Sequence, residues 1–546
     1  MPATRRRPWP CRPAKSALRV EPIGLENAAR ISSVVVIFAF FGATHVTETR
    51  GATAELYREH CAQCHGPDRL GGAGPALLPQ NLKRLRGNQA ESVIRDGRPA
   101  TQMPAFGDRL DGQQISALAR WIYTEPANVP IWDAEQIKGS RTVYRPELIT
   151  GDATSLAPVY SADPLNVFLV VEAGDHHVTV LDGDRFEPIH RFKSRFALHG
   201  GPKYTSDGRF VYLASRDGWI SKFDMYTLET VAEVRAGINT RNLAVSADDR
   251  YVMVANYLSH SLVLLNAGDL SLIKVIAVSD DAGNSSRVSA VYVAPPRQSF
   301  IAALKDLREV WEISYADDPP YYGLVHDYRY EGPPVESGRF PIRRIELDDY
   351  LDDFFFDQDY EHLIGAARNA RNGQVVNLIV GRKIADLQLA GMPHLGSGIT
   401  WMRDGVPVLA TPHLDTNRVS VIDMRDWHTI ETIETLGPGF FMRSHERSRY
   451  AWVDVFFGPH KDAVHVIDKS SLAIVKTLRP SPGQTAAHVE FTRDGRYALL
   501  SIWEDDGAIV VYDADTLEEI KRVPMRKPSG KYNVYNKITR SEGTSH

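Results

Sequence analysis

The spacing of hydrophobic and polar positions changes along the chain near residue 130. Segments 53–61 and 111–123 carry apolar side chains at helical intervals, with Ile115, Leu118, Ala119 and Ile122 on one face of the second. After a proline-containing linker at 125–130, short apolar segments bounded by turn residues predict β-strands instead. The pattern predicts a small all-α domain at 51–126, followed by an all-β domain over 135–546.

The predicted β domain contains an internal repeat. An apolar strand that ends in an acidic or amide residue recurs at intervals of 42 to 45 residues, and these strand ends are Asp182, Asp224, Asn266, Asp423, Asp468 and Asp513. Hairpin turns of the Asp-Gly-Arg type at 207–209, 248–250 and 494–496 precede further strands. Two irregular repeats around 309–314 and 375–380, with an insertion at 319–359, fill the interval that remains. Eight repeats of four short strands predict an eight-bladed β-propeller.

Composition and charge narrow the possible partners and the location. The 546 residues carry a net charge of only −5, and we find no Lys/Arg cluster with interleaved aromatic residues, so no nucleic acid partner is expected. Residues 1–50 form a predicted leader, whose apolar run at 32–43 is too short for a stable bilayer span but suits a signal peptide. An uncleaved N-terminal anchor is the alternative. We expect a periplasmic protein that meets the membrane only through this leader.

The cysteines point to a covalent haem. Cys11 lies in the leader, which leaves Cys61 and Cys64 in the sequence Cys-Ala-Gln-Cys-His65. Such a motif attaches haem c through two thioethers and supplies its histidine as an iron ligand. A thioredoxin-type redox pair would lack its βαβ context here. Met103, followed by a proline on a predicted loop, is the expected second iron ligand, so this domain should carry single electrons.

Several histidines of the β domain fall near the predicted starts of inner strands, where propeller side chains converge on the central channel. These are His199, His394 and His488, and His413 ends a neighbouring strand. Any one of them could be a structural histidine, but together they predict a ligand site. The histidines expected on the surface are His176, His177, His428, His460 and His465.

Several stretches resemble the d1-haem propeller of cd1-type nitrite reductases. They are 196–209, 216–217, 237–241, 366–372, 392–398 and 529–536. The resemblance extends over nearly the whole chain after the leader. It implies a non-covalent haem d1 or dihydro-haem d1 whose iron is bound by His199, with Arg216 and Arg241 facing the carboxylates of the macrocycle and His413 also at the cofactor.

The family contains two enzymes with this layout, a nitrite reductase and a dihydro-haem d1 dehydrogenase. His413 and His445 fall roughly where the reductase has two distal histidines, which favours reduction of nitrite to nitric oxide. His445, however, lies in a charged segment typical of a turn, and His488 replaces an apolar residue that is usual in the reductase. We therefore expect the dehydrogenase, with nitrite reductase as the alternative and a non-catalytic d1-haem carrier as a third interpretation.

The expected reaction converts a propionate side chain of dihydro-haem d1 to acrylate. A neutral imidazole suits the removal of the proton α to the carboxylate, so His394 and His488 are candidate bases. Tyr532 is expected to relay a proton or to hold the substrate carboxylate. Electrons would leave through haem c to an external acceptor, a small cytochrome or a cupredoxin, and the product would pass to apo-nitrite reductase.

Overall fold

The computed structural model describes residues 51–539 except 73, 84, 86, 99–102, 150–156, 320–337, 368–371 and 390. The expected leader and most of the 366–372 stretch lie outside this part. None of the described helices is long and apolar enough to cross a membrane.

The first domain is helical, as predicted. It consists of a helix at 51–60, α2 (Ala62–His65), α3 (Pro79–Leu82), α4 (Gly87–Asp96) and α5 (Gly112–Ile122). Asp111 begins α5 with a capping box, in which its carboxylate accepts from the Gln114 backbone N–H at 2.8 Å. The predicted apolar face of α5 packs against Tyr57 in one buried cluster. The domain thus has a hydrophobic core of its own.

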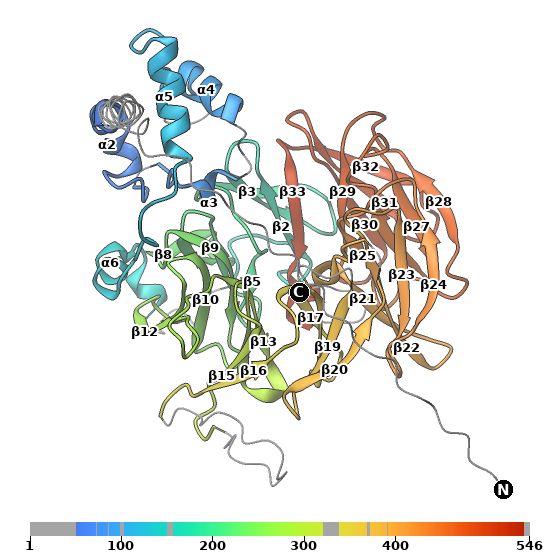
Figure 1. Cartoon of the computed structure of the whole chain (residues 1–546). Helices are drawn as coiled ribbons and strands as arrows, with labels where there is room; N and C mark the ends of the chain where they lie inside the picture. The colour runs from blue at the N-terminus through green and yellow to red at the C-terminus, as the bar shows by residue number, and fades with distance from the viewer. Residues whose placement is uncertain are drawn as a thin grey trace, which may run out of the picture.

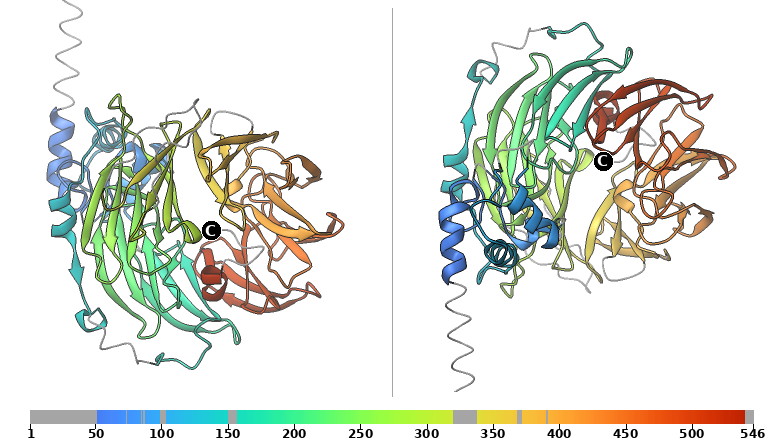
Figure 2. Two further views of the ribbon diagram at one scale, coloured as in Figure 1. Left: turned by 90° about the horizontal axis from the view of Figure 1, so that it is seen from below. Right: turned by 90° about the horizontal axis from the view of Figure 1, so that it is seen from above.

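The second domain is an eight-bladed β-propeller, which confirms the predicted fold (Figures 1 and 2). From the inner strand outward the blades are: blade 1, β33 (Pro528–Asn533), β2 (Val167–Glu172), β3 (His177–Asp182) and β4 (Pro188–Lys193); blade 2, β5 (Lys203–Tyr204), β6 (Phe210–Ala214), β7 (Trp219–Asp224), β8 (Glu229–Arg235) and β1 (Thr142–Val143); blade 3, β9 (Asn239–Val245), β10 (Tyr251–Leu258), β11 (Ser261–Asn266) and β12 (Leu272–Ala277); blade 4, β13 (Val288–Ala294), β14 (Ser299–Leu304), β15 (Glu309–Ser314) and β16 (Ile342–Glu346); blade 5, β17 (Leu351–Phe356), β18 (His362–Ala367), β19 (Gly373–Asn377) and β20 (Arg382–Leu387); blade 6, β21 (Ile399–Arg403), β22 (Val406–Pro412), β23 (Arg418–Asp423) and β24 (Thr429–Glu434); blade 7, β25 (Met442–Arg443), β26 (Tyr450–Asp454), β27 (Val464–Asp468) and β28 (Ile474–Leu478); blade 8, β29 (Ala486–Phe491), β30 (Tyr497–Ile502), β31 (Ala508–Asp513) and β32 (Glu519–Pro524). The ring closes because the C-terminal strand β33 pairs with β2.

The recurring acidic residue at the strand ends is a turn residue. Asp468, at the end of β27, accepts from the backbone N–H groups of Ser470 and Ser471, both at 3.0 Å. Asn266, at the end of β11, accepts in the same way from Gly268 at 2.7 Å. Each residue thereby starts the hairpin to the outermost strand, because its side chain replaces a backbone partner in the turn. The repeat is therefore a consequence of turn chemistry.

Short helices complete the propeller. The 3-10 helices η1 (Pro146–Leu148), η2 (Pro295–Arg297) and η3 (Leu395–Ser397) lie between strands, and α7 (Val534–Thr539) follows β33. The helix α6 (Ala134–Ser140), which the sequence pattern did not predict, contacts the outer strands β8 and β12. The helix α7 contacts the inner strands β33 and β5, so it is close to the central channel.

The helical domain docks on blades 2 and 3 (Figure 1). Ala76 and Leu78 form a buried apolar cluster with Ile238 and Leu258 of the propeller. The Asn81 amide donates to the Ile238 carbonyl at 3.2 Å. Because these propeller residues border the starts of inner strands, the helical domain lies beside the channel opening at which the candidate residues were predicted.

Candidate functional site

The haem c motif lies at the junction of two helical turns. The His65 backbone N–H donates to the Cys61 carbonyl at 2.9 Å, which places both thiols and the imidazole within about one helical turn. The Nδ1 of His65 lies 2.7 Å from the Pro75 carbonyl and donates to it, which leaves Nε2 for a metal. A Cβ on Gly74 would come within 2.8 Å of the His65 ring, so only glycine lets this loop pack against the imidazole. Burial lowers the pKa of His65 and favours the neutral, metal-binding form. These residues fit a covalently bound haem.

Met103 follows the haem c motif by almost 40 residues in the sequence but packs against the core of the same helical domain. Its side chain is half-buried against the cluster that contains Tyr57 and Phe106. Its carbonyl accepts from the Arg98 backbone N–H at 3.0 Å, and this bond closes the loop before Pro104. The four residues before Met103 lie outside the described part, and the role of Met103 as iron ligand stays a prediction.

His199 is oriented by blade 3. Its Nδ1 donates to the Arg241 carbonyl at 2.6 Å, and its Nε2 accepts from the Arg241 guanidinium at 2.9 Å. Arg241 also donates to the Ser289 carbonyl at 3.0 Å and lies 3.9 Å from the Asp353 carboxylate. The nitrogen of His199 that can bind a metal is therefore next to a cation that can bind carboxylates.

His394 belongs to the same group. It precedes η3, and its Nδ1 donates to the Phe440 carbonyl at 2.6 Å, so its Nε2 is the unprotonated nitrogen. Burial lowers its pKa, while the charges of Asp353 and Arg241 act on it in opposite directions. His199, Arg241, Asp353 and His394 thus come together from four different blades.

His488 and Tyr532 form a second pair beside this group. Their rings lie 5.3 Å apart in a T-shaped arrangement, and Phe441 covers His488 at 4.8 Å. A Cβ on Gly201 would lie 3.1 Å from the Tyr532 ring, so the phenol packs against the loop that carries His199. Burial, then the charge of Lys531, lowers the pKa of His488, whereas burial raises that of Tyr532 to about 12. Near neutral pH the imidazole is uncharged and the phenol is protonated.

Three further predicted residues occupy different positions. Arg216 lies in the turn between β6 and β7, where its backbone N–H donates to the Ala197 carbonyl at 3.0 Å, two residues before His199. His413 is fully buried and forms an antiparallel β-bridge with Pro393, the residue before His394. Its Nε2 lies 2.9 Å from the Ser420 hydroxyl, to which it is hydrogen-bonded. His445 is also fully buried, but it follows β25, whereas His413 follows β22. These two strands run in opposite directions between the ends of the channel, so the structure does not bring together the pair that favoured nitrite reduction.

Buried cations lie next to Tyr532, and sequence reasoning missed them. Lys531 is fully buried, and burial lowers its pKa to about 7. Burial likewise holds the pKa of Lys537, on α7, well below its ordinary value. Arg443 lies nearby and pairs with Glu490 at 3.1 Å. The stretch 529–536, which carries Lys531 and Tyr532, resembles the d1-haem propeller, but the alternation of inward and outward side chains cannot place a lysine without the tertiary structure.

A cavity continues down the channel from this group. Its lining includes Lys203, Tyr292, Phe355 and Lys537. Tyr292 donates to Asp353 at 3.0 Å, which connects the cavity to the group around His199. The candidate histidines themselves do not line it, because they lie at the starts of the inner strands and the cavity lies further along them. A basic, partly aromatic channel of this kind suits a flat ligand with several carboxylates.

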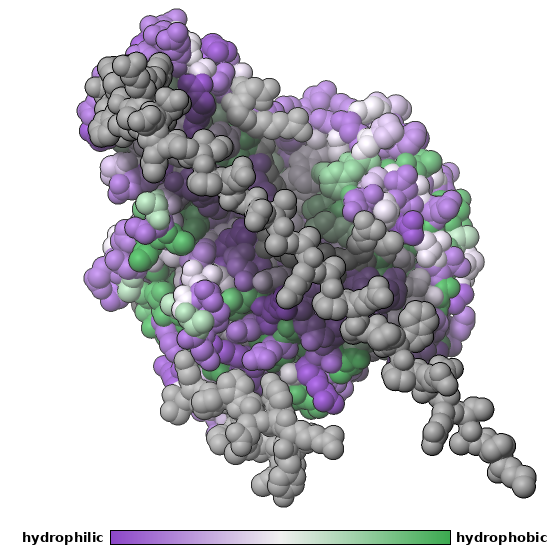
Figure 3. Space-filling model, viewed as in Figure 1, coloured by the Kyte–Doolittle hydropathy of each residue, from purple (hydrophilic) through white to green (hydrophobic). Residues whose placement is uncertain are grey.

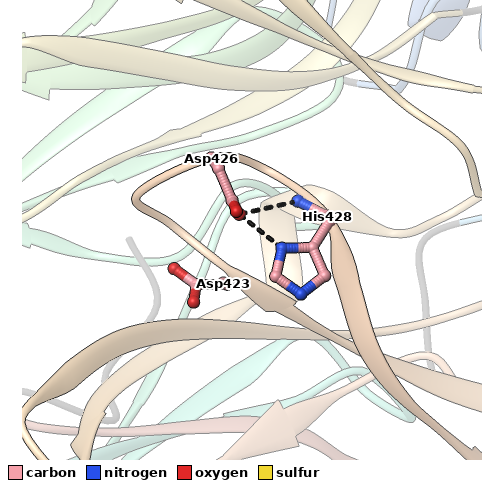
Figure 4. A group of neighbouring side chains, drawn as sticks. All are labelled: Asp423, Asp426 and His428. Carbon is pink, nitrogen blue, oxygen red and sulfur yellow. Dashed lines mark hydrogen bonds and ion pairs between the residues drawn. The ribbon is translucent and has the colours of Figure 1, made fainter.

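Two other histidines lie outside the group at the channel. His465, expected on the surface, is buried, and this prediction was wrong: its Nδ1 bonds Thr477 at 2.8 Å and its Nε2 accepts from the Leu436 N–H at 3.1 Å. His428 is exposed and lies with Asp423 and Asp426 in a group that could approach a metal (Figure 4). Asp423, however, caps its turn and pairs with Arg425 at 2.7 Å, so the group is explained by the hairpin.

The surface around the channel opening is unevenly polar. Polar residues cover most of the helical domain and the neighbouring propeller, while a hydrophobic patch lies over the C-terminal blades (Figure 3). Leu436 and Phe457 are among the exposed large apolar side chains of the described residues.

Comparison with known proteins places this geometry in a family. Residues 162–537 match the model described as Cytochrome D1 heme domain, and residues 50–122 match the model of Cytochrome C oxidase, cbb3-type, subunit III. Dihydro-heme d1 dehydrogenase of Pseudomonas aeruginosa is 56% identical over 90% of this chain and 95% of its own. Nitrite reductase of Stutzerimonas stutzeri is 25% identical over 94% of this chain and 98% of its own.

A solved structure is similar over the same extent. Dihydro-heme d1 dehydrogenase NirN in complex with DHE superimposes with a TM-score of 0.83 and 56% identity, over 89% of this chain and 99% of that one. The predicted two-domain architecture is thereby confirmed, and the chain belongs to the cytochrome D1 heme domain family.

Proposed function

We propose that this protein is a dihydro-haem d1 dehydrogenase, an oxidoreductase of haem d1 biosynthesis that converts a propionate side chain of its substrate to acrylate. The observation that carries the proposal is the group His394, His488 and Tyr532 at the channel, in a chain 56% identical to a dehydrogenase of that name. Nitrite reduction has weaker support, because the nitrite reductase is 25% identical and His413 and His445 follow strands of opposite direction.

The reaction removes two hydrogens from adjacent carbons. The CH₂–CH₂ unit loses two protons and two electrons, and one C=C bond forms. His394 is suited to accept the proton α to the carboxylate, because its Nδ1 donates to Phe440 and its Nε2 is therefore free of a proton. His488 and Tyr532 would relay the second proton and hold the carboxylate. When bound at Cys61, Cys64, His65 and Met103, haem c supplies one-electron transfer out of the site.

The remaining predicted residues would hold the substrate. His199 would offer Nε2 to the substrate iron, and Arg241, whose guanidinium donates to that nitrogen here, would turn to a carboxylate of the substrate. Arg216 would contribute a second guanidinium. His413 would contribute indirectly, because its backbone pairs with Pro393 and so supports the segment that carries His394. Outside the protein, the proposal requires an electron acceptor such as a small cytochrome or cupredoxin, with apo-nitrite reductase as receiver of the product, in the periplasm.

The test supplies the purified, haem c-loaded protein with dihydro-haem d1 and, in a separate reaction, with nitrite and a reductant. We expect conversion to haem d1 in the absorption spectrum and no nitric oxide. His394→Ala and His488→Ala should lose desaturation while still binding the tetrapyrrole, and the exposed His428→Ala serves as the matched control. Nitric oxide formation without desaturation, or full activity of both variants, would refute the proposal.

A further inference from the structure

The backbone at His488 adopts a conformation that its own side chain does not favour. His488 has φ of +54°, and the pairing of β29 with β30 shifts by one residue between Ala487 and Val489. A non-glycine residue in the left-handed region costs about 1–3 kcal/mol and persists only when its surroundings impose it. Neighbouring groups must therefore hold this bulge.

Two buried charged side chains hold the two peptide groups of His488. The Asp454 carboxylate accepts from its N–H at 3.2 Å, and the Lys531 ammonium donates to its carbonyl. Lys531 also donates to Ser501 at 2.9 Å. Asp454 and Lys531 are 1% and 0% exposed. The charge of Lys531 lowers the pKa of Asp454, and the charge of Asp454 raises the pKa of Lys531. Burying two such charges costs free energy, which good geometry and additional hydrogen bonds must offset.

The same carboxylate also holds the loop that orients His394. Its other oxygen accepts from the backbone N–H groups of Phe440 at 2.7 Å and Phe441 at 3.0 Å. The Phe440 carbonyl in turn accepts from Nδ1 of His394 at 2.6 Å. One carboxylate of blade 7 thus connects an imidazole of blade 6 to an imidazole of blade 8.

We propose that Asp454 and Lys531 are positioning residues, which fix both candidate imidazoles at the channel and set which nitrogen of each carries a proton. The inference rests on the proposed function and extends it. His394 donates from Nδ1 and presents a bare Nε2, the form of a base. The Lys531 ammonium lies 3.5 Å from Nδ1 of His488 and disfavours a proton there, so His488 presents Nε2–H, the form of a donor.

The electrostatic surroundings agree with this division. Burial raises the pKa of Asp454 to about 6, and Lys531 opposes this rise. The charges of Lys531, Arg443 and Lys537 all keep His488 neutral, and Glu490 is the carboxylate that faces Lys531 besides Asp454. As pH falls through about 6, protonation of Asp454 weakens its acceptor role and should release both imidazoles together.

The test compares Asp454→Asn with the wild type and with Glu312→Gln. Glu312 is a buried carboxylate of blade 4 that pairs with Arg297 at 2.8 Å, so it controls for the loss of a buried carboxylate elsewhere. An asparagine nitrogen cannot accept the His488 N–H. We expect a fall in kcat of about 100-fold, typical of a misplacement of about 1 Å, with the dissociation constant of dihydro-haem d1 unchanged within about threefold. The acidic limb of the kcat profile near pH 6 should disappear.

A second readout does not require turnover. In the haem c-loaded protein without tetrapyrrole, ¹⁵N-histidine spectra should show His488 and His394 shifted together in Asp454→Asn, and His488 alone losing its tautomer preference in Lys531→Met. Wild-type kcat, pH profile and histidine spectra in Asp454→Asn would overturn the inference. If Asp454→Asn does not fold, Asp454→Glu displaces the carboxylate by one methylene and gives the same readouts. Absence of desaturation in the wild type together with shifted spectra in the variant would refute the proposed function alone.

Discussion

Arg235 provides the sharpest test of how the two domains are held together. Its guanidinium is buried, donates from Nε to the Asp217 carbonyl at 2.9 Å and donates across the domain boundary to the Leu70 carbonyl. It also stacks on Trp132 of the linker at 4.5 Å. Arg235→Met keeps the apolar stem but removes the donors. A hydrogen bond from a charged group contributes about 1.5–3 kcal/mol, so the equilibrium between docked and undocked domains should shift by about 10- to 150-fold.

Hydrogen–deuterium exchange measures this shift directly. We expect faster exchange in segments 74–83 and 236–238 of Arg235→Met, because local opening exposes the amides of the interface. The matched control is Arg209→Met, another buried arginine of blade 2, whose pair with Asp224 at 3.0 Å lies within the blade. Electron transfer to haem c should slow in Arg235→Met while tetrapyrrole binding persists. Wild-type protection of both segments in this variant would show that Arg235 does not hold the interface.

Two more predictions follow from local geometry. Gly74→Ala should displace the His65 ring, because the added Cβ would lie 2.8 Å from it. Spectroelectrochemistry of haem c should then show a changed reduction potential. An unchanged potential and absorption spectrum would contradict the packing of Gly74 against His65. Burial, and next the charge of Arg479, lowers the pKa of His465 in the folded protein to about 4. As the pH falls from about 6.5 to 4, the unfolded state therefore binds a proton at His465 before the folded state does. The free energy of unfolding should fall by about 3 kcal/mol in that window. His465→Gln should flatten this part of the curve of unfolding free energy against pH, and an unaltered slope would refute the assignment.

The parts of this protein that could be predicted from the sequence depend on residues close together in the chain. The haem attachment motif, Cys61 to His65, lies within about one helical turn. Its spacing alone therefore gives the geometry that two thioethers and an iron ligand require. The eight blades were predictable because six third strands recognisable in the sequence end in an acidic or amide residue such as Asp468, which caps its own turn, and the remaining interval has the length of two more blades. That chemistry repeats wherever the hairpin repeats.

The candidate site could be predicted only in part. Position near the start of an inner strand singled out His199, His394 and His488, and the structure places all of them around the channel opening. The resemblance to the nitrite reductase paired His413 with His445, but both are fully buried and they follow strands of opposite direction. It also placed His465 on the surface, although the side chain is covered by the loop at 435–436. Burial within a blade depends on neighbouring strands, which the local pattern does not contain.

The sequence by itself determined the haem c motif, the number of blades and the set of histidines available to the channel, because these follow from short-range spacing and turn chemistry. Only the tertiary structure decided which of them meet. The contact between His394 and Phe440 joins residues 46 positions apart, and Lys531 reaches His488 across 43. The bulge at His488 shifts the alternation of β29, and the buried charges of Asp454 and Lys531 act only after the ring has closed through β33. Long-range closure and a local shift of register cannot be deduced from periodicity, and together they set the arrangement of the site.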